Sequence, residues 1–125
     1  MKFKDKLPIC IIGAGPSGLA TARAFRDHGL EFFVLEKHKD VGGIWDMEND
    51  GSPMYEAAHF ISSKSLSGFR GHPMPDEYPD YPNRKQILAS IRSFAETEAL
   101  KKYLHFNTQV RKVIKLDEEE WEIET

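Results

Sequence analysis

The sequence has 125 residues, of which 40% are hydrophobic and 30% charged, and its formal net charge is −3. This length suits one globular domain. With Lys and Arg scattered along a slightly acidic chain, neither nucleic acid nor an electrostatic membrane anchor is expected as a partner. The single cysteine, Cys10, has no disulfide partner, which favours a reducing cytoplasmic location. After the basic start of the chain, the apolar stretch at 7–12 is too short for a signal peptide or a membrane span.

The first third of the chain predicts a strand, a helix and a second strand. Residues 7–12 form an apolar run rich in isoleucine, which is typical of a strand buried on both faces. Small and apolar residues recur at helical spacing over residues 16–28, with Pro16 in the first turn and Gly29 after the last. Residues 31–36, EFFVLE, read as another buried strand. This order predicts a parallel βαβ unit and places the chain in the α/β class.

The remaining elements are expected after a long loop. Residues 37–82 contain five prolines and many small polar residues, and a loop of this length usually serves a site. Asn83 begins the capping-box pattern NRKQ, and apolar residues at helical spacing follow, so a helix of about four turns is expected there. Residues 104–110 and 111–116 are strand candidates, and the sequence DEEEWEIET indicates a C-terminal β-hairpin.

One motif points to a ligand. Gly13, Gly15 and Gly18 form G-x-G-x-x-G between the first strand and the helix. The first glycine allows the tight turn, the second lets a pyrophosphate approach the backbone, and the third allows close packing of helix and strand. The start of the helix then offers N–H groups and partial positive charge to that phosphate. Glu36 ends the second strand eighteen residues after Gly18, where a carboxylate can accept hydrogen bonds from the hydroxyls of an adenosine ribose. The simpler interpretation is a glycine turn that serves packing alone.

The residues that follow carry a family resemblance. Glu36, five residues and then Gly42–Gly43 resemble the FAD-binding segment of flavoproteins that contain two dinucleotide-binding domains. The sequence GGIW at 42–45 is similar to the GGxW of class B flavin monooxygenases. Within that class the stretch from 54 to 91 resembles the flavin-containing monooxygenases, and the residues that carry the likeness are Tyr55, Lys64, Pro73 and Pro75. The family has an asparagine three residues before the lysine, where this sequence has Ile61.

The resemblance implies a fold and a set of cofactor residues. Residues 1–125 are expected to form an incomplete Rossmann-like FAD-binding domain with a parallel βαβ core and a C-terminal hairpin. This would be the N-terminal part of a flavoprotein with two dinucleotide-binding domains, whose NADPH-binding domain is absent from this chain. The expected cofactor-binding residues are Gly13, Ala14, Gly15, Pro16, Ser17, Gly18, Glu36, Lys37, Gly43, Ile44, Trp45, Ser62 and Val110.

The same resemblance implies an activity. The longer protein would use NADPH, FAD and O2 to transfer one oxygen atom to a nucleophilic nitrogen or sulfur of a small molecule, or to insert it beside a carbonyl. Two alternatives stay open: a dinucleotide-binding module without catalysis, and another FAD/NAD(P)H oxidoreductase such as a Baeyer–Villiger type enzyme. The five histidines show no metal-ligand spacing, so no metal is expected, and no catalytic residue is assigned.

Overall fold

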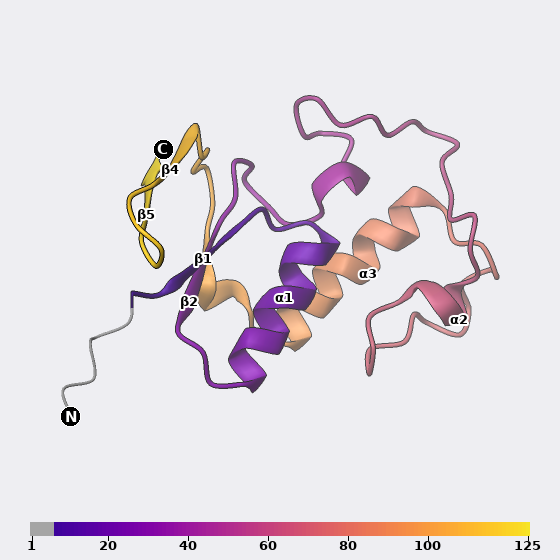
Figure 1. The fold of residues 1–125 in the computed structure, drawn as a ribbon. Coiled ribbons are helices and arrows are strands. Elements are labelled where there is room, and N and C mark those ends of the chain that lie inside the picture. Colours follow the sequence, from indigo (N-terminus) through magenta and orange to yellow (C-terminus); the bar gives the residue numbers. More distant parts are fainter. Residues whose placement is uncertain (1–6) are drawn as a thin grey trace.

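The computed structural model describes residues 7–125, and the basic residues 1–6 lie outside this range. Its first half contains the expected βαβ unit (Figure 1): β1 (Ile9–Ile12), α1 (Pro16–Asp27) and β2 (Phe32–Leu35). Helix α1 begins directly after Gly15 with Pro16 in its first turn, and Gly29 follows its end with a φ of 68°. Because only glycine adopts this φ without strain, the helix stops where the sequence predicts.

Strands β1 and β2 are parallel and pair in register from Ile9 with Phe32 to Ile12 with Leu35. A third parallel strand, β3 (Leu104–His105), lies on the other side of β2, which gives the order β1-β2-β3. This strand is shorter than the expected 104–110, because Asn107 takes a left-handed φ of 52° and turns the chain. Within residues 7–125, β1 is therefore an edge strand of this sheet.

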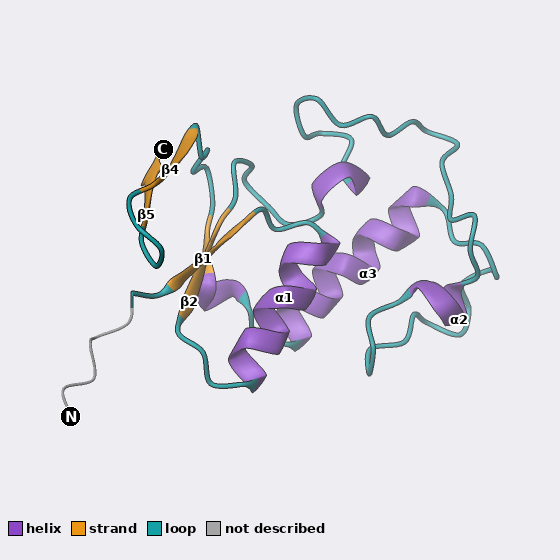
Figure 2. Cartoon of the chain, in the orientation of Figure 1, coloured by secondary structure: helices purple, strands orange, loops and turns teal. Residues whose placement is uncertain are grey.

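Helices α1 and α3 (Arg84–Thr97) lie side by side against one face of the sheet (Figure 2). Helix α3 begins with the predicted capping box, in which Asn83 accepts a hydrogen bond from the Gln86 N–H and the Gln86 side chain accepts one from the Asn83 N–H. The short helix η2 (Lys101–Tyr103) then leads into β3. The core joins apolar residues from both helices and the sheet, including Ile11, Leu19, Ala22, Val34, Ile87, Ile91 and Phe94.

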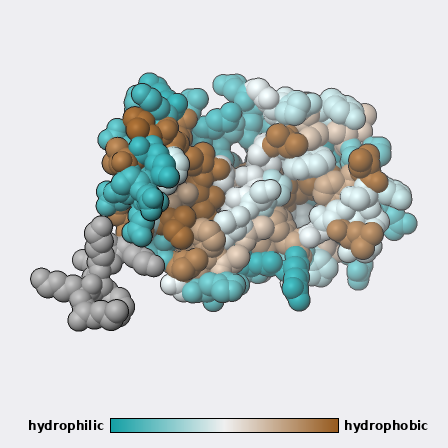
Figure 3. Space-filling model, in the orientation of Figure 1, coloured by the Kyte–Doolittle hydropathy of each residue, from teal (hydrophilic) through white to brown (hydrophobic). Residues whose placement is uncertain are grey.

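The C-terminal hairpin lies on the opposite side of the sheet from the two helices (Figure 1). Its strands, β4 (Lys112–Lys115) and β5 (Trp121–Glu124), are antiparallel, as expected. In Figure 3, apolar surface gathers on the side of the molecule where the hairpin and the sheet lie. Large hydrophobic residues exposed in these elements are Ile9, Ile12, Val113 and Trp121.

The long segment 37–82 is mostly loop, and its helical pieces are η1 (Gly43–Trp45) and α2 (Lys64–Ser67). Hydrogen bonds from Lys64 organise the proline-rich part. Its ammonium donates to the carbonyls of Asp76 at 2.8 Å and Tyr78 at 2.6 Å, and its backbone N–H donates to the Asp80 carbonyl. Lys64 therefore replaces donors that the prolines cannot supply.

Removing the cap of α3 tests how much this helix depends on it. We expect Asn83→Ala to lower the free energy of unfolding by about 1 kcal/mol, because the Gln86 N–H loses its acceptor. Ser93→Ala, at an exposed position of the same helix, is the matched control. Urea unfolding of both variants measures the difference, and equal stability of the two would contradict the role of the cap.

Candidate functional site

The glycine turn that follows β1 exposes its backbone. Gly13 has a φ of 100°, and a Cβ built on it would meet no heavy atom within 4 Å. Its N–H donates to the Leu35 carbonyl at 2.8 Å, which ties the turn to the end of β2. The turn is therefore held in place on one side and uncrowded on the other.

The third glycine of the motif explains how the turn and the helix pack. A Cβ on Gly18 would lie 1.9 Å from the Gly13 carbonyl oxygen and 3.0 Å from the Gly13 carbonyl carbon. Since both atoms are backbone, neither can move aside without opening the turn. Only glycine fits at this position.

Glu36 lies beneath the glycine turn and is 5% exposed. Its Oε2 accepts a hydrogen bond of 2.6 Å from the Ala14 N–H, and its Oε1 accepts one of 2.9 Å from the His38 N–H. A carboxylate oxygen has two lone-pair sites, so both oxygens keep capacity for hydroxyl donors. The end of β2 thus presents a fixed acceptor beside the exposed backbone of Gly13.

The Gly42–Gly43 pair brings a second stretch of backbone against the glycine turn. The Gly42 N–H donates to the Ala14 carbonyl at 3.1 Å, and a Cβ on Gly43 would lie 3.0 Å from the Cα of Gly15. Gly42 and Gly43 have φ values of 136° and 59°, which favour glycine. The pair therefore allows two backbone turns to touch.

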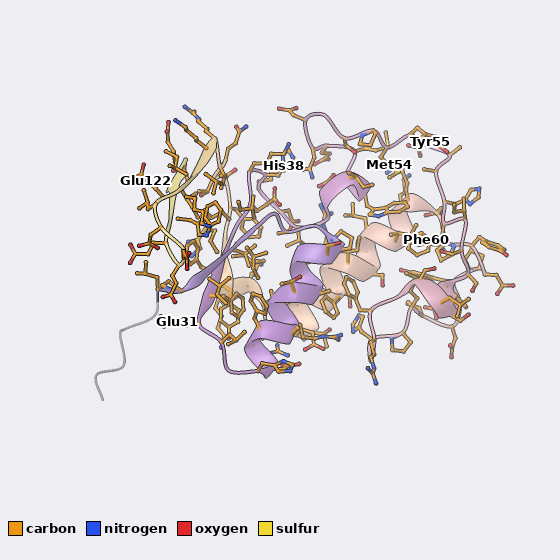
Figure 4. All side chains as sticks on the ribbon, viewed as in Figure 1. Glu31, His38, Met54, Tyr55, Phe60 and Glu122 are labelled. Atoms are coloured by element: carbon orange, nitrogen blue, oxygen red, sulfur yellow. The ribbon has the colours of Figure 1, made fainter. Side chains whose placement is uncertain are left out.

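A cavity of about 430 Å³ opens where these parts meet, at the end of the sheet where Figure 4 labels His38. This volume falls in the range of ligand sites. Its lining contains seven predicted cofactor residues, namely Gly13, Gly15, Glu36, Lys37, Gly43, Ile44 and Val110. We call it the turn cavity. Val110 contributes from the irregular segment between β3 and β4.

A second cavity, of about 340 Å³, lies between α1, α3 and the loop and is lined mainly by apolar and aromatic side chains. Pro16, Ser17 and Trp45 of the predicted set line it. Trp45 meets Phe60 edge to face with 5.3 Å between ring centroids, and Figure 4 shows Phe60 on the α3 side of the molecule. The predicted residues are thus divided between two neighbouring cavities.

Three predicted residues line neither cavity. Ala14 is fully buried and contributes its N–H to Glu36, and Gly18 serves the close packing of α1. Ser62 is exposed, and its hydroxyl is hydrogen-bonded to that of Ser67. Ser67, the partner of Ser62, lines the second cavity, so the predicted role of Ser62 stays a prediction.

Sequence reasoning missed several residues of the turn cavity. Those with polar side chains are His38, Asn49, Asp50, Ser52, Thr108 and Gln109. The sequence did offer a signal for His38, Thr108 and Gln109, because each lies within two residues of a predicted cofactor residue. Asn49 and Ser52 belong to a loop without periodicity, so no pattern in the sequence identifies them.

Three further observations concern metal ions, cysteine reactivity and membranes. Among the described residues, no group of three His, Cys, Asp or Glu side chains could hold a metal ion. Burial raises the pKa of the Cys10 thiol above its ordinary value, which works against its reactivity as a nucleophile. Within residues 7–125, no helix is both long and apolar enough to span a membrane.

Comparison with known proteins identifies the family. The sequence model described as "Flavin-binding monooxygenase-like" matches residues 6–125. The chain belongs to this family. It is 34% identical to the thiol-specific monooxygenase of Saccharomyces cerevisiae over 98% of its length, and 34% identical to the rat (Rattus norvegicus) flavin-containing monooxygenase 3 over 96%. The predicted relationship to flavin monooxygenases is confirmed.

The chain is much shorter than these relatives. It spans 30% of the yeast protein and 24% of the rat protein. Among solved structures, it is similar to a mutant flavin monooxygenase from Stenotrophomonas maltophilia, with a TM-score of 0.79, 26% identity and coverage of 96% of this chain and 33% of that one. An FAD-bound structure of OTEMO has the same fold, with a TM-score of 0.81, 22% identity and coverage of 94% and 22%. The predicted fold, an α/β domain with a parallel βαβ core and a hairpin, is confirmed as that of the family.

A methyl group at Gly18 tests the packing of the glycine turn. Gly18→Ala should gain up to about 1 kcal/mol of helix propensity. The contact with the Gly13 carbonyl costs more, because overpacking against rigid atoms costs about 1–3 kcal/mol. We expect a net loss of stability in thermal or urea unfolding.

The matched control for this variant is Gly68→Ala. A Cβ on Gly68 would have its closest contact at 3.7 Å, an ordinary van der Waals distance. If Gly18→Ala were as stable as the control, the close approach of α1 to the turn would be refuted.

Proposed function

We propose that this chain is the FAD-binding part of an NADPH-dependent flavin monooxygenase that transfers one oxygen atom from O2 to a nucleophilic nitrogen or sulfur of a small molecule. Family membership supports the reaction class. The names of two relatives, a thiol-specific monooxygenase and an N-oxide-forming dimethylaniline monooxygenase, support the substrate class. Solved structures of the same fold have FAD and NADP bound, which supports the cofactors.

The observation that carries the proposal is the juxtaposition of bare backbone and a fixed carboxylate in the turn cavity. Gly13 has open space where a side chain would stand, so a diphosphate can approach its backbone. Glu36 lies at the same cavity with unused lone pairs, which suits the two hydroxyls of a ribose. The residues present therefore fit an adenine dinucleotide.

The roles of the chain's own residues follow from their positions. Gly13 and Gly15 would accommodate the diphosphate, and the start of α1 would stabilise its charge. Glu36 would orient the ribose, and Lys37 and Val110 would border the adenosine end. When bound, FAD supplies the redox chemistry, because it takes electrons from NADPH and reacts with O2.

We assign the flavin end of FAD to the residues that follow the Gly42–Gly43 pair in the sequence. Ile44 lines that cavity and Trp45 the neighbouring apolar one, so these two residues would flank the path towards the flavin ring. Ser62 is proposed near the flavin ring because of the family resemblance.

In this arrangement residues 1–125 form the FAD-binding domain, and the NADPH site lies outside this chain. The cytoplasm is the proposed compartment, in keeping with a lone cysteine.

Titration of the chain with FAD tests the proposal, with binding measured by the change in flavin fluorescence and absorption. We expect the chain to bind FAD and Glu36→Gln to bind it about tenfold more weakly, because hydrogen bonds to a charged group contribute about 1.5–3 kcal/mol. The glutamine amide cannot accept from both the Ala14 and the His38 N–H groups. Glu48→Gln is the control, because Glu48 is exposed and outside the cavity lining. Absence of FAD binding by the unsubstituted chain would refute the proposal.

NADPH consumption separates the proposed function from a module without catalysis. The G-x-G-x-x-G motif occurs once in the sequence. We therefore expect the FAD-loaded 125-residue chain to oxidise NADPH no faster than free FAD does. The longer gene product should oxidise NADPH and consume O2, and failure of that protein to do so would favour the non-catalytic alternative.

A further inference from the structure

Asp46 is a buried carboxylate next to the turn cavity but outside its lining. It directly follows η1 and is 3% exposed. Its Oδ2 accepts a hydrogen bond of 2.8 Å from Nη2 of Arg92 on α3, and its Oδ1 accepts one of 3.0 Å from the Glu48 N–H. Because an unpaired buried charge is costly, the position of Asp46 depends on Arg92.

Arg92 joins both ends of the segment that contains the Gly42–Gly43 pair. Its Nε lies 3.1 Å from Oδ2 of Asp40, and its Nη2 binds Asp46. Arg92 thus forms an ion pair with the half-exposed Asp40 and a hydrogen bond with the buried Asp46, on either side of the two glycines, and its Nε makes no hydrogen bond within residues 7–125. Glycines have the largest backbone freedom, so an external constraint on this segment has a large effect on its geometry.

Two further side chains fix the carbonyls of the turn. The Asn49 amide donates to the Gly43 carbonyl at 2.9 Å, and the Ser52 hydroxyl donates to the Ile44 carbonyl at 2.6 Å. Asn49 is itself connected to Asp46, since its N–H donates to the Asp46 carbonyl at 3.2 Å. A trans peptide directs its N–H opposite to its carbonyl, so these bonds also fix the Ile44 and Trp45 N–H directions.

We propose that Asp46 and Arg92 are positioning residues for dinucleotide binding. The pair holds Gly43 against Gly15 and thereby keeps the wall of the turn cavity in its binding geometry without touching the ligand. Neither residue lines the turn cavity, whereas Gly43 and Asn49, which are hydrogen-bonded to the backbone of Asp46, do. The inference rests on the proposed function, because it assigns the site of FAD binding to this cavity.

The test is FAD affinity in two variants with opposite changes of charge. Asp46→Asn removes a negative charge and Arg92→Gln a positive one. If the pair positions the wall, we expect both variants to bind FAD about tenfold more weakly, by analogy with the loss of metal affinity when residues behind metal ligands are substituted, and the double variant to bind no more weakly than the worse single one. If the residues acted only through charge on the anionic ligand, Asp46→Asn would bind more tightly, which would overturn the proposal.

Glu98→Gln is the matched control. Glu98 forms an ion pair of 2.7 Å with Arg26 at the ends of α1 and α3 that lie away from the turn cavity. We expect this variant to lose thermal stability and to keep its FAD affinity, measured where every variant is folded by circular dichroism. Unchanged affinity in folded Arg92→Gln would overturn the proposal, because the pair would then contribute only to stability. Since Arg92 is 40% exposed, this variant remains informative even if Asp46→Asn does not fold.

A second measurement needs no ligand. In a Trp121→Phe background Trp45 is the only tryptophan, and it ends the turn that the pair holds. We expect Arg92→Gln to increase acrylamide quenching of Trp45, and Glu98→Gln to leave it unchanged. Equal quenching in all variants would overturn the positioning role even if FAD binds. If the unsubstituted chain bound no FAD but the quenching differed, the proposed function would fail while the structural constraint stood.

Discussion

The hydrogen bond from the Ala14 N–H to the Glu36 carboxylate connects the two parts on which the site depends. It joins the turn after β1 to the end of β2, inside the protein, with a carboxylate that is 5% exposed. Hydrogen bonds to a buried charged group are stronger than neutral ones and are costly to leave unmade. The same carboxylate also accepts the His38 N–H, so the chain leaving β2 is fixed as well. The proposed ligand-binding residue is therefore also a structural one.

The long loop is ordered by backbone hydrogen bonds of its turns and, in addition, by side chains that donate to backbone carbonyls. Lys64 donates such hydrogen bonds to carbonyls of the proline-rich stretch, and Asn49 and Ser52 donate them to carbonyls next to the Gly42–Gly43 pair. Asn49, Ser52 and Lys64 all belong to the irregular segment 37–82, where no hydrophobic periodicity predicts their contacts. A loop without regular secondary structure keeps a fixed conformation when side chains supply hydrogen bonds that a helix or sheet would otherwise provide to its backbone carbonyls.

The sequence was sufficient for the elements whose signals are local. The Ile-rich run, the glycine motif and the capping box at Asn83 placed β1, α1 and α3 within a residue or two, because each depends on its own neighbours. The expected length of β3 was wrong because Asn107 takes a left-handed φ that ends the strand; asparagine tolerates this conformation but does not require it, so the sequence alone does not predict the turn. Ser62 is predicted near the flavin by resemblance alone, because the structure shows only its hydrogen bond with Ser67. The Asp46–Arg92 pair joins residues 46 positions apart in an ion pair that no periodicity reveals.

The position of β1 at the side of its sheet has a consequence for work with the isolated polypeptide. Ile9 and Ile12 are exposed there, and within residues 7–125 this parallel strand has a neighbour on one side only, which leaves alternate amides and carbonyls directed outward. Such an edge is a template for adding another strand, from the same gene product or from a second molecule. If two molecules pair at this edge, the apparent melting temperature and the ligand occupancy of the polypeptide depend on protein concentration.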